Sequence, residues 1–314
     1  MAKFIITTDS SCDCAIDELK QKNIPVVFFE YADGTKTLVD DMNEDNYKNF
    51  YENMKKGTVY KTSQINPQRF YDFFKELLHL NLPIIHMSLG SGLSNTVNSV
   101  HMAINMLKED FSNCDIKVID SKIASLGLTV MLNKLVELRD NNVEAEEAFE
   151  IVNSKVINTI AYYTTDTLTY FARGGRLSKV EAFLGNALKI NPILDCTPAG
   201  TLRIVDKVRG SKRAIEQLVN RVKDVVIDPL NQYVLVCHAD DEERGHLVGQ
   251  KLVDEVGFKG YKLYFMGPII GAHTGPGLVA VFFEGKTRTD EIKSLSKNSA
   301  EDINEEINKN LKQF

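Results

Sequence analysis

The sequence lacks the long charged and apolar runs that would assign it to a nucleic acid or a membrane. Lys and Arg do not gather into a long basic cluster, and the net charge is −6 with a sequence pI of about 5.6. A nucleic-acid-binding face is normally rich in Lys and Arg, and anionic lipid surfaces repel acidic proteins. No apolar run approaches the roughly 20 residues that span a bilayer. We therefore expect no nucleic-acid partner and no stable membrane insertion.

Cysteine is also scarce, and its pattern is typical of neither disulfides nor structural zinc. The chain has five cysteines, Cys12, Cys14, Cys114, Cys196 and Cys237. An odd, scattered set suits a reducing compartment better than a disulfide framework. Since no second Cys or His pair stands at zinc-ligand spacing, we expect no metal site. The first residues lead directly into a short apolar run without a signal-peptide core, which predicts a cytoplasmic protein.

Short apolar runs alternate with helical patterns through the first half of the chain. The strands predicted from these runs are Phe4–Thr7, Pro25–Tyr31, Leu82–Met87 and Asp115–Ile119. The helices predicted between and after them are Asn43–Lys56, Pro67–Leu80, Thr96–Lys108 and Leu126–Asn141. This alternation indicates βαβ units around a parallel sheet. We expect residues 1–155 to form an α/β domain whose mainly parallel sheet is flanked by helices, with a hairpin-type turn at Ala32-Asp33-Gly34.

The pattern changes after about residue 155. The strands predicted here are Thr159–Thr165, Ile190–Leu194, Thr201–Val208, Tyr233–His238, Tyr261–Met266 and Leu278–Phe283. The predicted helices are Thr167–Ala172, Ser211–Val226 and Asp241–Val256. Hairpins mixed with crossovers predict a second α/β domain with a mixed sheet for residues 156–285, with a hinge in Glu144–Asn158. Apolar residues at spacings near three and four predict an amphipathic helix for residues 286–314.

Polar loops follow several of the predicted strands, and open α/β sheets bind their ligands at such strand ends. Asp9-Ser10-Ser11 and Asp120-Ser121 are favoured as helix caps, and Thr62-Ser63-Gln64 could equally cap the helix that follows. The loop Ser88–Thr96 combines glycines with a helix N-terminus, so it could hold a phosphate or a carboxylate. It lacks the Gly-Lys-Ser/Thr of a P-loop and the full dinucleotide fingerprint.

Two further segments are unusual. Arg173-Gly174-Gly175-Arg176 places two cations around a turn, which is typical either of a partner or anion contact or of a solvated helix end. Gly267–Gly277 is rich in glycine and proline, and its only polar side chains are His273 and Thr274. A rigid turn with a satisfied histidine would explain it, but a rigid loop that presents His273 to an anion is favoured.

Taken in order, these strings resemble the DegV family, and the resemblance extends to about Gly285. The strings that carry it are Thr8-Asp9-Ser10, Thr62-Ser63-Gln64, Leu93-Ser94-Asn95-Thr96, Val118-Ile119-Asp120-Ser121, Arg173-Gly174-Gly175-Arg176-Leu177, Asn191-Pro192-Ile193-Leu194 and Gly271-Ala272-His273-Thr274-Gly275-Pro276-Gly277. Each string alone is weak, but seven in the correct order are specific.

The resemblance implies a non-catalytic bacterial protein that binds one long-chain fatty acid, such as palmitate, in a buried tunnel between two domains. It implies no other cofactor. The carboxylate contacts that it implies are Thr62, Ser94 and His273, with Ser63 and Thr274 as neighbours. The bound acid would be presented to a partner fatty acid kinase, in lipid transport or fatty acid metabolism. The kinase contact is expected near Arg176 and Arg173.

This chain departs from the family pattern at several positions. Ile65 and Asn66 separate Gln64 from Pro67, where the family commonly has Pro-Ser. Asn95 stands where glycine is usual, although asparagine tolerates left-handed geometry better than most residues. Val97 replaces a common aromatic residue, which could alter the acyl preference.

Two alternative functions remain open on the sequence. An acyl hydrolase or transferase could use Ser94 as nucleophile and His273 as base, but the chain offers no convincing carboxylate to orient His273. Alternatively, the terminal helix and the arginine turn could dock a partner in a pure interaction module. Binding itself is physically feasible, because burial of a C16 chain contributes roughly 10 kcal/mol before ordering costs.

Overall fold

The computed structural model describes residues 3–177 and 190–291. Within these ranges the first half is built on a four-stranded parallel sheet of order β2-β1-β6-β7. Its strands are β1 (Ile5–Asp9), β2 (Val26–Val27), β6 (Ile84–Ser88) and β7 (Ile116–Asp120). Every residue of β6 is buried, as its central position in the sheet and its apolar character predict. The predicted parallel sheet is therefore confirmed.

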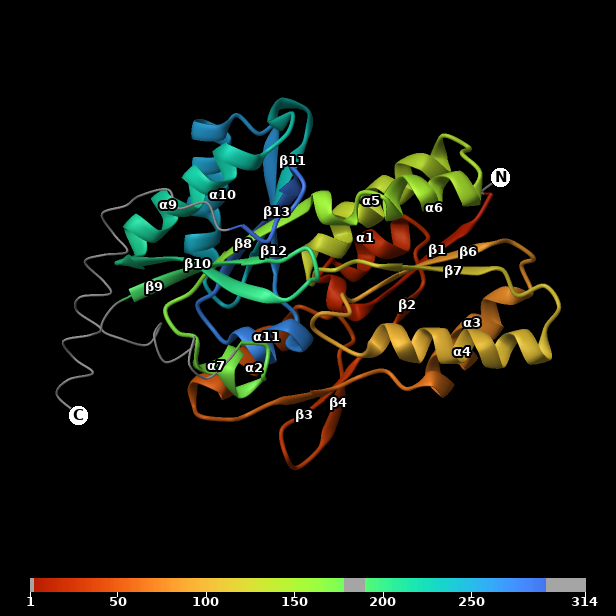
Figure 1. Ribbon diagram of the computed structural model, residues 1–314. Helices are drawn as coiled ribbons and strands as arrows, with labels where there is room; N and C mark the ends of the chain where they lie inside the picture. Colours follow the sequence, from red (N-terminus) through yellow and green to blue (C-terminus); the bar gives the residue numbers. More distant parts are fainter. Residues whose placement is uncertain (1–2, 178–189, 292–314) are drawn as a thin grey trace.

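Helices cover both faces of this sheet (Figure 1). On one face, α3 (Pro67–Leu78) packs against α4 (Thr96–Asp110). On the other lie α1 (Ile16–Gln21), α5 (Leu126–Asp140) and α6 (Ala145–Asn153). The short helices α1 and α6 were not predicted. Helix α6 occupies most of the segment expected to be a hinge, so that segment is largely helical.

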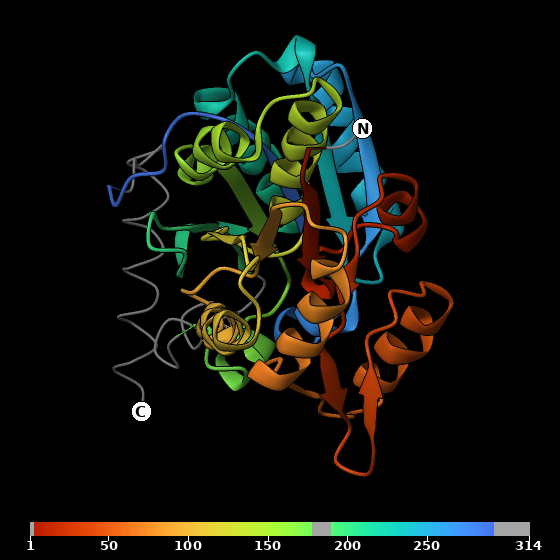
Figure 2. The ribbon, with the colours of Figure 1, turned by 90° about the vertical axis from the view of Figure 1, so that its right-hand side faces the viewer.

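A small antiparallel sheet of order β4-β3-β5 projects from the first half (Figure 1, Figure 2). Its strands are β3 (Glu30–Ala32), β4 (Thr37–Val39) and β5 (Lys61–Ser63), and α2 (Asp45–Lys55) lies between β4 and β5 in the chain. The predicted strand Pro25–Tyr31 is wrong as a single element, because its ends belong to β2 and β3 in different sheets. The predicted turn is confirmed: Gly34 has φ +92°, and β3 pairs with β4.

The second half is built on a six-stranded mixed sheet of order β10-β9-β8-β13-β11-β12. Its strands are β8 (Thr159–Thr164), β9 (Ile190–Cys196), β10 (Leu202–Arg209), β11 (Tyr233–His238), β12 (Gly260–Phe265) and β13 (Val279–Glu284). Strands β11 and β12 are parallel, and the other neighbours are antiparallel. The mixed sheet is as predicted.

Two hydrophobic clusters hold the sheets in place. Helices α9 (Ser211–Val225) and α10 (Glu242–Val256) pack on one face of the mixed sheet, around a cluster confined to the second half. Helix α5 of the first half packs on β8, β11 and β13, and the larger cluster contains residues of both halves. The two sheets are therefore joined by a continuous apolar core.

Two short helices face each other where the halves meet. They are α7 (Thr169–Arg173) and α11 (Pro268–Thr274). The expectation of a rigid loop over Gly267–Gly277 is wrong for its first part, which forms α11 and only then turns at Gly275, with φ +77°. The predicted C-terminal helix falls mainly on residues 292–314, outside the described residues. No helix in the described part of the chain is long and apolar enough to cross a membrane.

Candidate functional site

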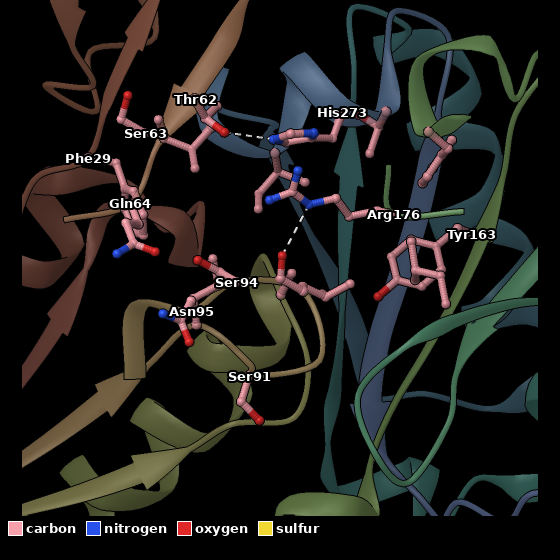
Figure 3. Close-up of a pocket in the computed structure, with 18 residues that line it drawn as sticks. Phe29, Thr62, Ser63, Gln64, Ser91, Ser94, Asn95, Tyr163, Arg176 and His273 are labelled. Atoms are coloured by element: carbon pink, nitrogen blue, oxygen red, sulfur yellow. Dashed lines mark hydrogen bonds between the residues drawn. The ribbon is translucent and has the colours of Figure 1, made fainter. Parts of the chain in front are cut away.

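A cavity of about 540 Å³ lies between the two halves of the molecule (Figure 3). Its apolar lining consists of Phe29, Leu89, Leu93, Ala124, Tyr163, Phe171, Leu202, Ile269 and Ile270. Its polar lining consists of Thr62, Ser63, Gln64, Ser91, Ser94, Asn95, Arg176, His273 and Thr274. All five residues that the sequence predicted as carboxylate contacts are in this lining, although they come from three separate segments of the chain. In Figure 3, Thr62, His273, Arg176 and Ser94 face a common space.

Thr62 and His273 form a hydrogen bond across the two halves. Thr62 Oγ1 lies 2.7 Å from Nε2 of His273. Thr62 and Ser63 are on β5, so this part of the predicted polar loop is instead the edge strand of the small sheet. His273 is in the last turn of α11. The contact therefore depends on how α11 is seated against the first half.

The first half holds α11 at its N-terminal end. The backbone N–H of Gly267, the N-cap residue, donates to Asp13 Oδ1 at 3.0 Å. The hydroxyl of Tyr51 donates to the carbonyl of Met266 at 3.0 Å. Gly271 lets the helix approach closely, since a β-carbon there would lie 2.4 Å from Tyr51 Oη. Buried carboxylate and phenol groups of the first half thus position the helix that carries His273.

His273 is neutral at physiological pH. Burial, and then the nearby charge of Arg176, lower the pKa of His273 from 6.5 to about 4. Its Nδ1 is buried and has no hydrogen-bond partner among the described residues. A buried N–H without a partner is rarer than an under-satisfied acceptor, so the proton belongs on Nε2. The ring then donates to Thr62 Oγ1, which leaves the Thr62 hydroxyl hydrogen free to donate into the cavity.

Arg176 supplies a positive charge to the same space. Its Nε donates to the carbonyl of Leu93 at 3.1 Å, and its Nη1 donates to the carbonyl of Gly174 at 2.6 Å. Figure 3 shows the guanidinium group next to the His273 ring. Burial lowers the pKa of Arg176 from its ordinary value. An arginine has five N–H donors, so further donors are available to an anion in the cavity.

The sequence predicts Arg176 at a partner surface, whereas the structure places it in the cavity lining. Arg173 matches that expectation better, because it is exposed, lies outside the cavity lining and stacks over the Tyr170 ring at 5.4 Å. The two glycines between Arg173 and Arg176 are the sequence signal for a sharp turn at this point. Gly175 has φ +71°, which reverses the chain and returns Arg176 toward the cavity.

Ser94 lies at the start of α4. Its Oγ is 2.8 Å from Thr96 Oγ1 and accepts from the Thr96 backbone N–H at 3.3 Å. Two carboxylates, the buried Asp9 and the half-buried Asp120, hold the loop that carries Ser94. Asp9 accepts from the N–H of Leu89 at 2.9 Å, and Asp120 accepts from the N–H of Ser91 at 2.9 Å.

The remaining predicted contacts are more peripheral. Ser63 is exposed at the cavity edge, beside Thr62. Thr274 is buried, and its hydroxyl donates to Met266 Sδ at 3.2 Å. The sequence favoured Asp9 and Asp120 as helix caps. In the structure they also fix the loop that carries Ser94, a role that only the tertiary contacts reveal.

The structure does not pair Ser94 with His273 as nucleophile and base. In the described residues the Ser94 hydroxyl contacts Thr96, and the His273 ring contacts Thr62. No carboxylate contacts His273 Nδ1 in the same part of the chain. Likewise, no group of three His, Cys, Asp or Glu side chains is arranged as metal ligands within residues 3–177 and 190–291.

These features define a class of protein: an α/β fold with one parallel and one mixed sheet, enclosing an apolar cavity with a cationic and hydroxyl-rich end. The family model described as "Uncharacterised protein, DegV family" matches residues 3–286. The chain belongs to the DegV family. The family resemblance and the fold class predicted from the sequence are thus confirmed.

Individual relatives match along nearly their whole length. A DegV domain-containing protein of Clostridium perfringens is 29% identical over 289 residues, which cover 92% of this chain and 99% of that protein. One of Caldanaerobacter subterraneus is 31% identical over 286 residues, covering 91% and 100%. The solved structure of a DegV lipid-binding protein from Thermotoga maritima has a TM-score of 0.81 at 25% identity, covering 91% and 100%. DegV of Bacillus subtilis, described as a fatty acid binding protein, has a TM-score of 0.76 at 26% identity, covering 91% and 100%.

Proposed function

We propose that this protein binds one long-chain fatty acid in the cavity between its two halves. The observation that carries the proposal is the composition of the cavity: an apolar lining, with Thr62, Ser94, Arg176 and His273 facing a common space within it. A fatty acid has the matching chemistry, an apolar chain with a single anionic head. Relatives described as lipid-binding and fatty-acid-binding share the fold.

The polar region meets the demands of a buried carboxylate. A charge removed from water must be paired and hydrogen-bonded. Arg176 provides the counter-charge, and Thr62 provides a hydroxyl donor whose direction is set by the His273 N–H. Ser94 provides a second hydroxyl, and Ser63 and Thr274 are secondary contacts.

The apolar lining supplies most of the affinity. Each buried methylene contributes about 0.8 kcal/mol, hence roughly 10 kcal/mol for a C16 chain, before the costs of ordering and association. A volume of about 540 Å³ is within the range of roughly 300–1,000 Å³ usual for small-molecule sites. Palmitate is the ligand that we expect.

In this role the protein is a non-catalytic cytoplasmic carrier that takes part in lipid transport or fatty acid metabolism. Two domains, residues 1–155 and 156–285, close around the ligand. The carrier presents the carboxylate to a partner fatty acid kinase. The exposed Arg173, at the end of α7 and next to the cavity turn, is the expected kinase contact. We expect Arg173→Ala to slow acyl phosphorylation by the kinase while lipid content stays unchanged.

Native mass spectrometry of freshly purified protein, followed by lipid extraction, tests the binding function. The expected result is a mass excess equal to one long-chain fatty acid, sharply reduced in Ser94→Ala. Ser99→Ala is the matched control, because Ser99 is buried in α4, the helix that follows Ser94, and lies outside the cavity lining. An absence of bound or bindable fatty acid in the wild type would overturn the proposal. Acyl ester hydrolysis that is lost in His273→Ala would instead favour the enzyme.

A further inference from the structure

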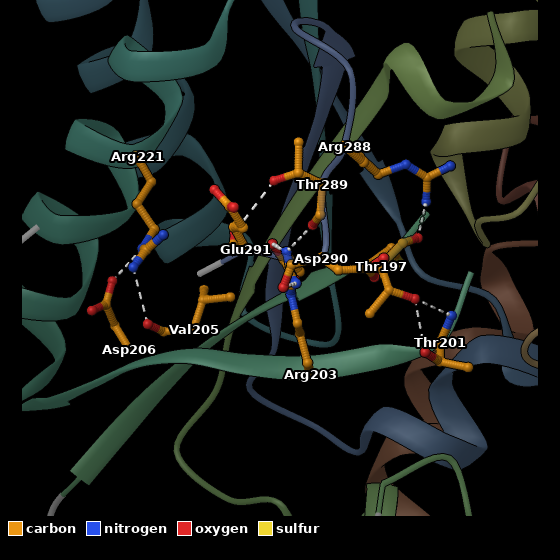
Figure 4. Close-up of polar contacts among 12 residues, drawn as sticks. Thr197, Thr201, Arg203, Val205, Asp206, Arg221, Arg288, Thr289, Asp290 and Glu291 are labelled. Atoms are coloured by element: carbon orange, nitrogen blue, oxygen red, sulfur yellow. Dashed lines mark hydrogen bonds and ion pairs between the residues drawn. The ribbon is translucent and has the colours of Figure 1, made fainter. Parts of the chain in front are cut away.

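After β13 the chain crosses back over the junction between the two halves. The N–H of Lys286 donates to the carbonyl of Val225 at 2.7 Å, and the N–H of Arg288 donates to the carbonyl of Ile157 at 2.9 Å. Arg203 of β10 is ion-paired with Asp195 and also donates to the carbonyls of Thr289 and Asp290, both at 2.8 Å. Residues 286–291 are therefore tied down as a strap (Figure 4).

Arg288 is the residue of this strap that reaches between the halves. The residue is 7% exposed. Nη1 donates to the carbonyl of Lys122 at 2.7 Å and to that of Thr197 at 3.1 Å, and Nη2 donates to that of Val156 at 3.1 Å. Among the described residues it has no ion-pair partner, and burial lowers the pKa of its guanidinium. A buried charge is thus used to bind the backbone carbonyls of three separate segments.

Two of these segments form a wall of the lipid cavity. Lys122 lies two residues after Asp120, and its Nζ donates to Ser91 Oγ at 2.8 Å. Ser91 in turn lines the cavity. Thr197 begins the turn that leads to Leu202, which lines the cavity from the other half.

The two segments also meet in direct backbone contact, which we call the seam. A β-carbon at Gly92 would lie 2.5 Å from the backbone of Gly200, and one at Gly200 would lie 2.9 Å from the carbonyl of Lys122. Glycine at both positions permits this approach. The carbonyls of Lys122 and Thr197 accept from the same side-chain nitrogen, and this shared donor holds the two segments together. That donor is Arg288.

We propose that Arg288 is a positioning residue that keeps the cavity closed along this seam and thereby slows release of the bound lipid. The proposal rests on the proposed function, since it assigns a role in lipid retention. Arg288 is not itself part of the cavity lining and acts through the two backbone segments. The seam lies beside Ser91 and Leu202, so it fastens the two halves in addition to the contact between Thr62 and His273.

The test compares Arg288→Lys with Arg221→Lys. Arg221 is 5% exposed and bonds to Asp206 and to the carbonyl of Val205, and both of these partners belong to the second half. A lysine keeps the charge but cannot reach several carbonyls in the same geometry. We expect release of a fluorescent fatty acid to be faster on the order of tenfold in Arg288→Lys. Release from Arg221→Lys should stay near the wild-type rate, even if this variant loses as much unfolding free energy as Arg288→Lys does.

Amide hydrogen exchange gives a readout that does not require bound lipid. In Arg288→Lys we expect faster exchange at Ser91 and Gly200, whose N–H groups bond to Asp120 and Thr197, with no such change in Arg221→Lys. Unchanged exchange and an unchanged release rate would overturn the inference. If the wild type binds no fatty acid, the proposed function fails while the exchange result still decides whether Arg288 fastens the seam.

Gly200→Ala provides a second variant, in case Arg288→Lys does not fold. Gly200 has φ +85°, and an added β-carbon would press on the Lys122 carbonyl from the opposite side of the seam. Faster lipid release and faster exchange at Ser91 are expected here too. A Gly200→Ala protein that retains lipid and protects Ser91 as well as the wild type would contradict the inference.

Discussion

Gly174 lies directly against the imidazole ring of His273. A β-carbon at Gly174 would stand 2.3 Å from Nδ1 of His273, closer than any real contact allows. The glycine therefore makes room for the ring, and the ring in turn orients Thr62. The Gly-Gly turn is thus part of the cavity architecture, whatever partner the neighbouring Arg173 contacts.

Gly174→Ala should displace His273 and weaken lipid binding about tenfold or more, because one hydrogen-bonded donor of the anchor loses its direction. Gly175→Ala is the control: its φ of +71° strains alanine, but nothing lies within 4 Å of the added carbon. It should cost about 1–2 kcal/mol of stability without moving the ring. Titration with a fluorescent fatty acid measures both, and equal affinities in the two variants would refute the packing argument.

Thr62 and His273 should act as one unit toward the ligand. If the His273 N–H orients the Thr62 hydroxyl, Thr62→Val and His273→Ala remove the same interaction. The double variant should then bind little worse than either single variant, with a coupling energy of about 1 kcal/mol. Calorimetric titration of all four proteins completes the cycle. Strict additivity would show that the two side chains contact the ligand independently.

Acid should destabilise the fold partly through His273. Its pKa is lowered from 6.5 to about 4. A base with a lowered folded pKa stabilises the fold fully above its ordinary pKa, and this contribution is lost as the pH falls through the folded value. His273→Asn should therefore lose less unfolding free energy than the wild type between pH 6.5 and pH 4, by roughly 2–3 kcal/mol. Urea denaturation across this range measures it, and His101→Asn, at an exposed position on α4, should follow the wild type.

Asp13 should tolerate amidation but not truncation. Burial is the main reason that the pKa of Asp13 is raised well above the ordinary range, which favours its neutral form. Asparagine can still accept from the Gly267 N–H and donate to the Ser125 hydroxyl, which contacts Asp13. Asp13→Asn should change stability by less than about 1 kcal/mol, whereas Asp13→Ala should cost about 2–4 kcal/mol and weaken lipid binding, because α11 loses its N-terminal acceptor. Equal losses in denaturation experiments would show that the charge itself is required.

The cavity volume should set the acyl length. Ala124 is 7% exposed and lines the cavity. Ala124→Leu adds three carbons there, so bound acids should be shorter by about three methylenes. Leu202→Ala should shift the distribution toward longer chains. Lipid extraction and mass spectrometry of the copurified acids measure the acyl-length distribution of each variant and of the wild type. An unchanged distribution in both variants would place the acyl chain elsewhere.

Much of the fold could be predicted because its signals are local. The run Tyr233–His238 became β11 with the same bounds, and α3 began at Pro67 as expected, although its N-cap is Asn66 rather than the string Thr62-Ser63-Gln64. Helices α1 and α6 were missed because helices this short are stabilised by packing rather than by their own propensity. Helix α11 was missed because glycine and proline argue against a helix, while the Asp13 and Tyr51 groups that support it come from the distant N-terminal part of the chain.

The sequence by itself determined which segments carry polar groups at strand ends and which runs are apolar, and its ordered motifs indicated the family. The tertiary structure alone decided which of those groups meet. It paired Thr62 with His273, turned Arg176 into the cavity and brought Lys122 and Thr197 onto Arg288. Hydrophobic periodicity is a property of neighbours in sequence, whereas a binding site depends on distances between residues that only a packed core brings together.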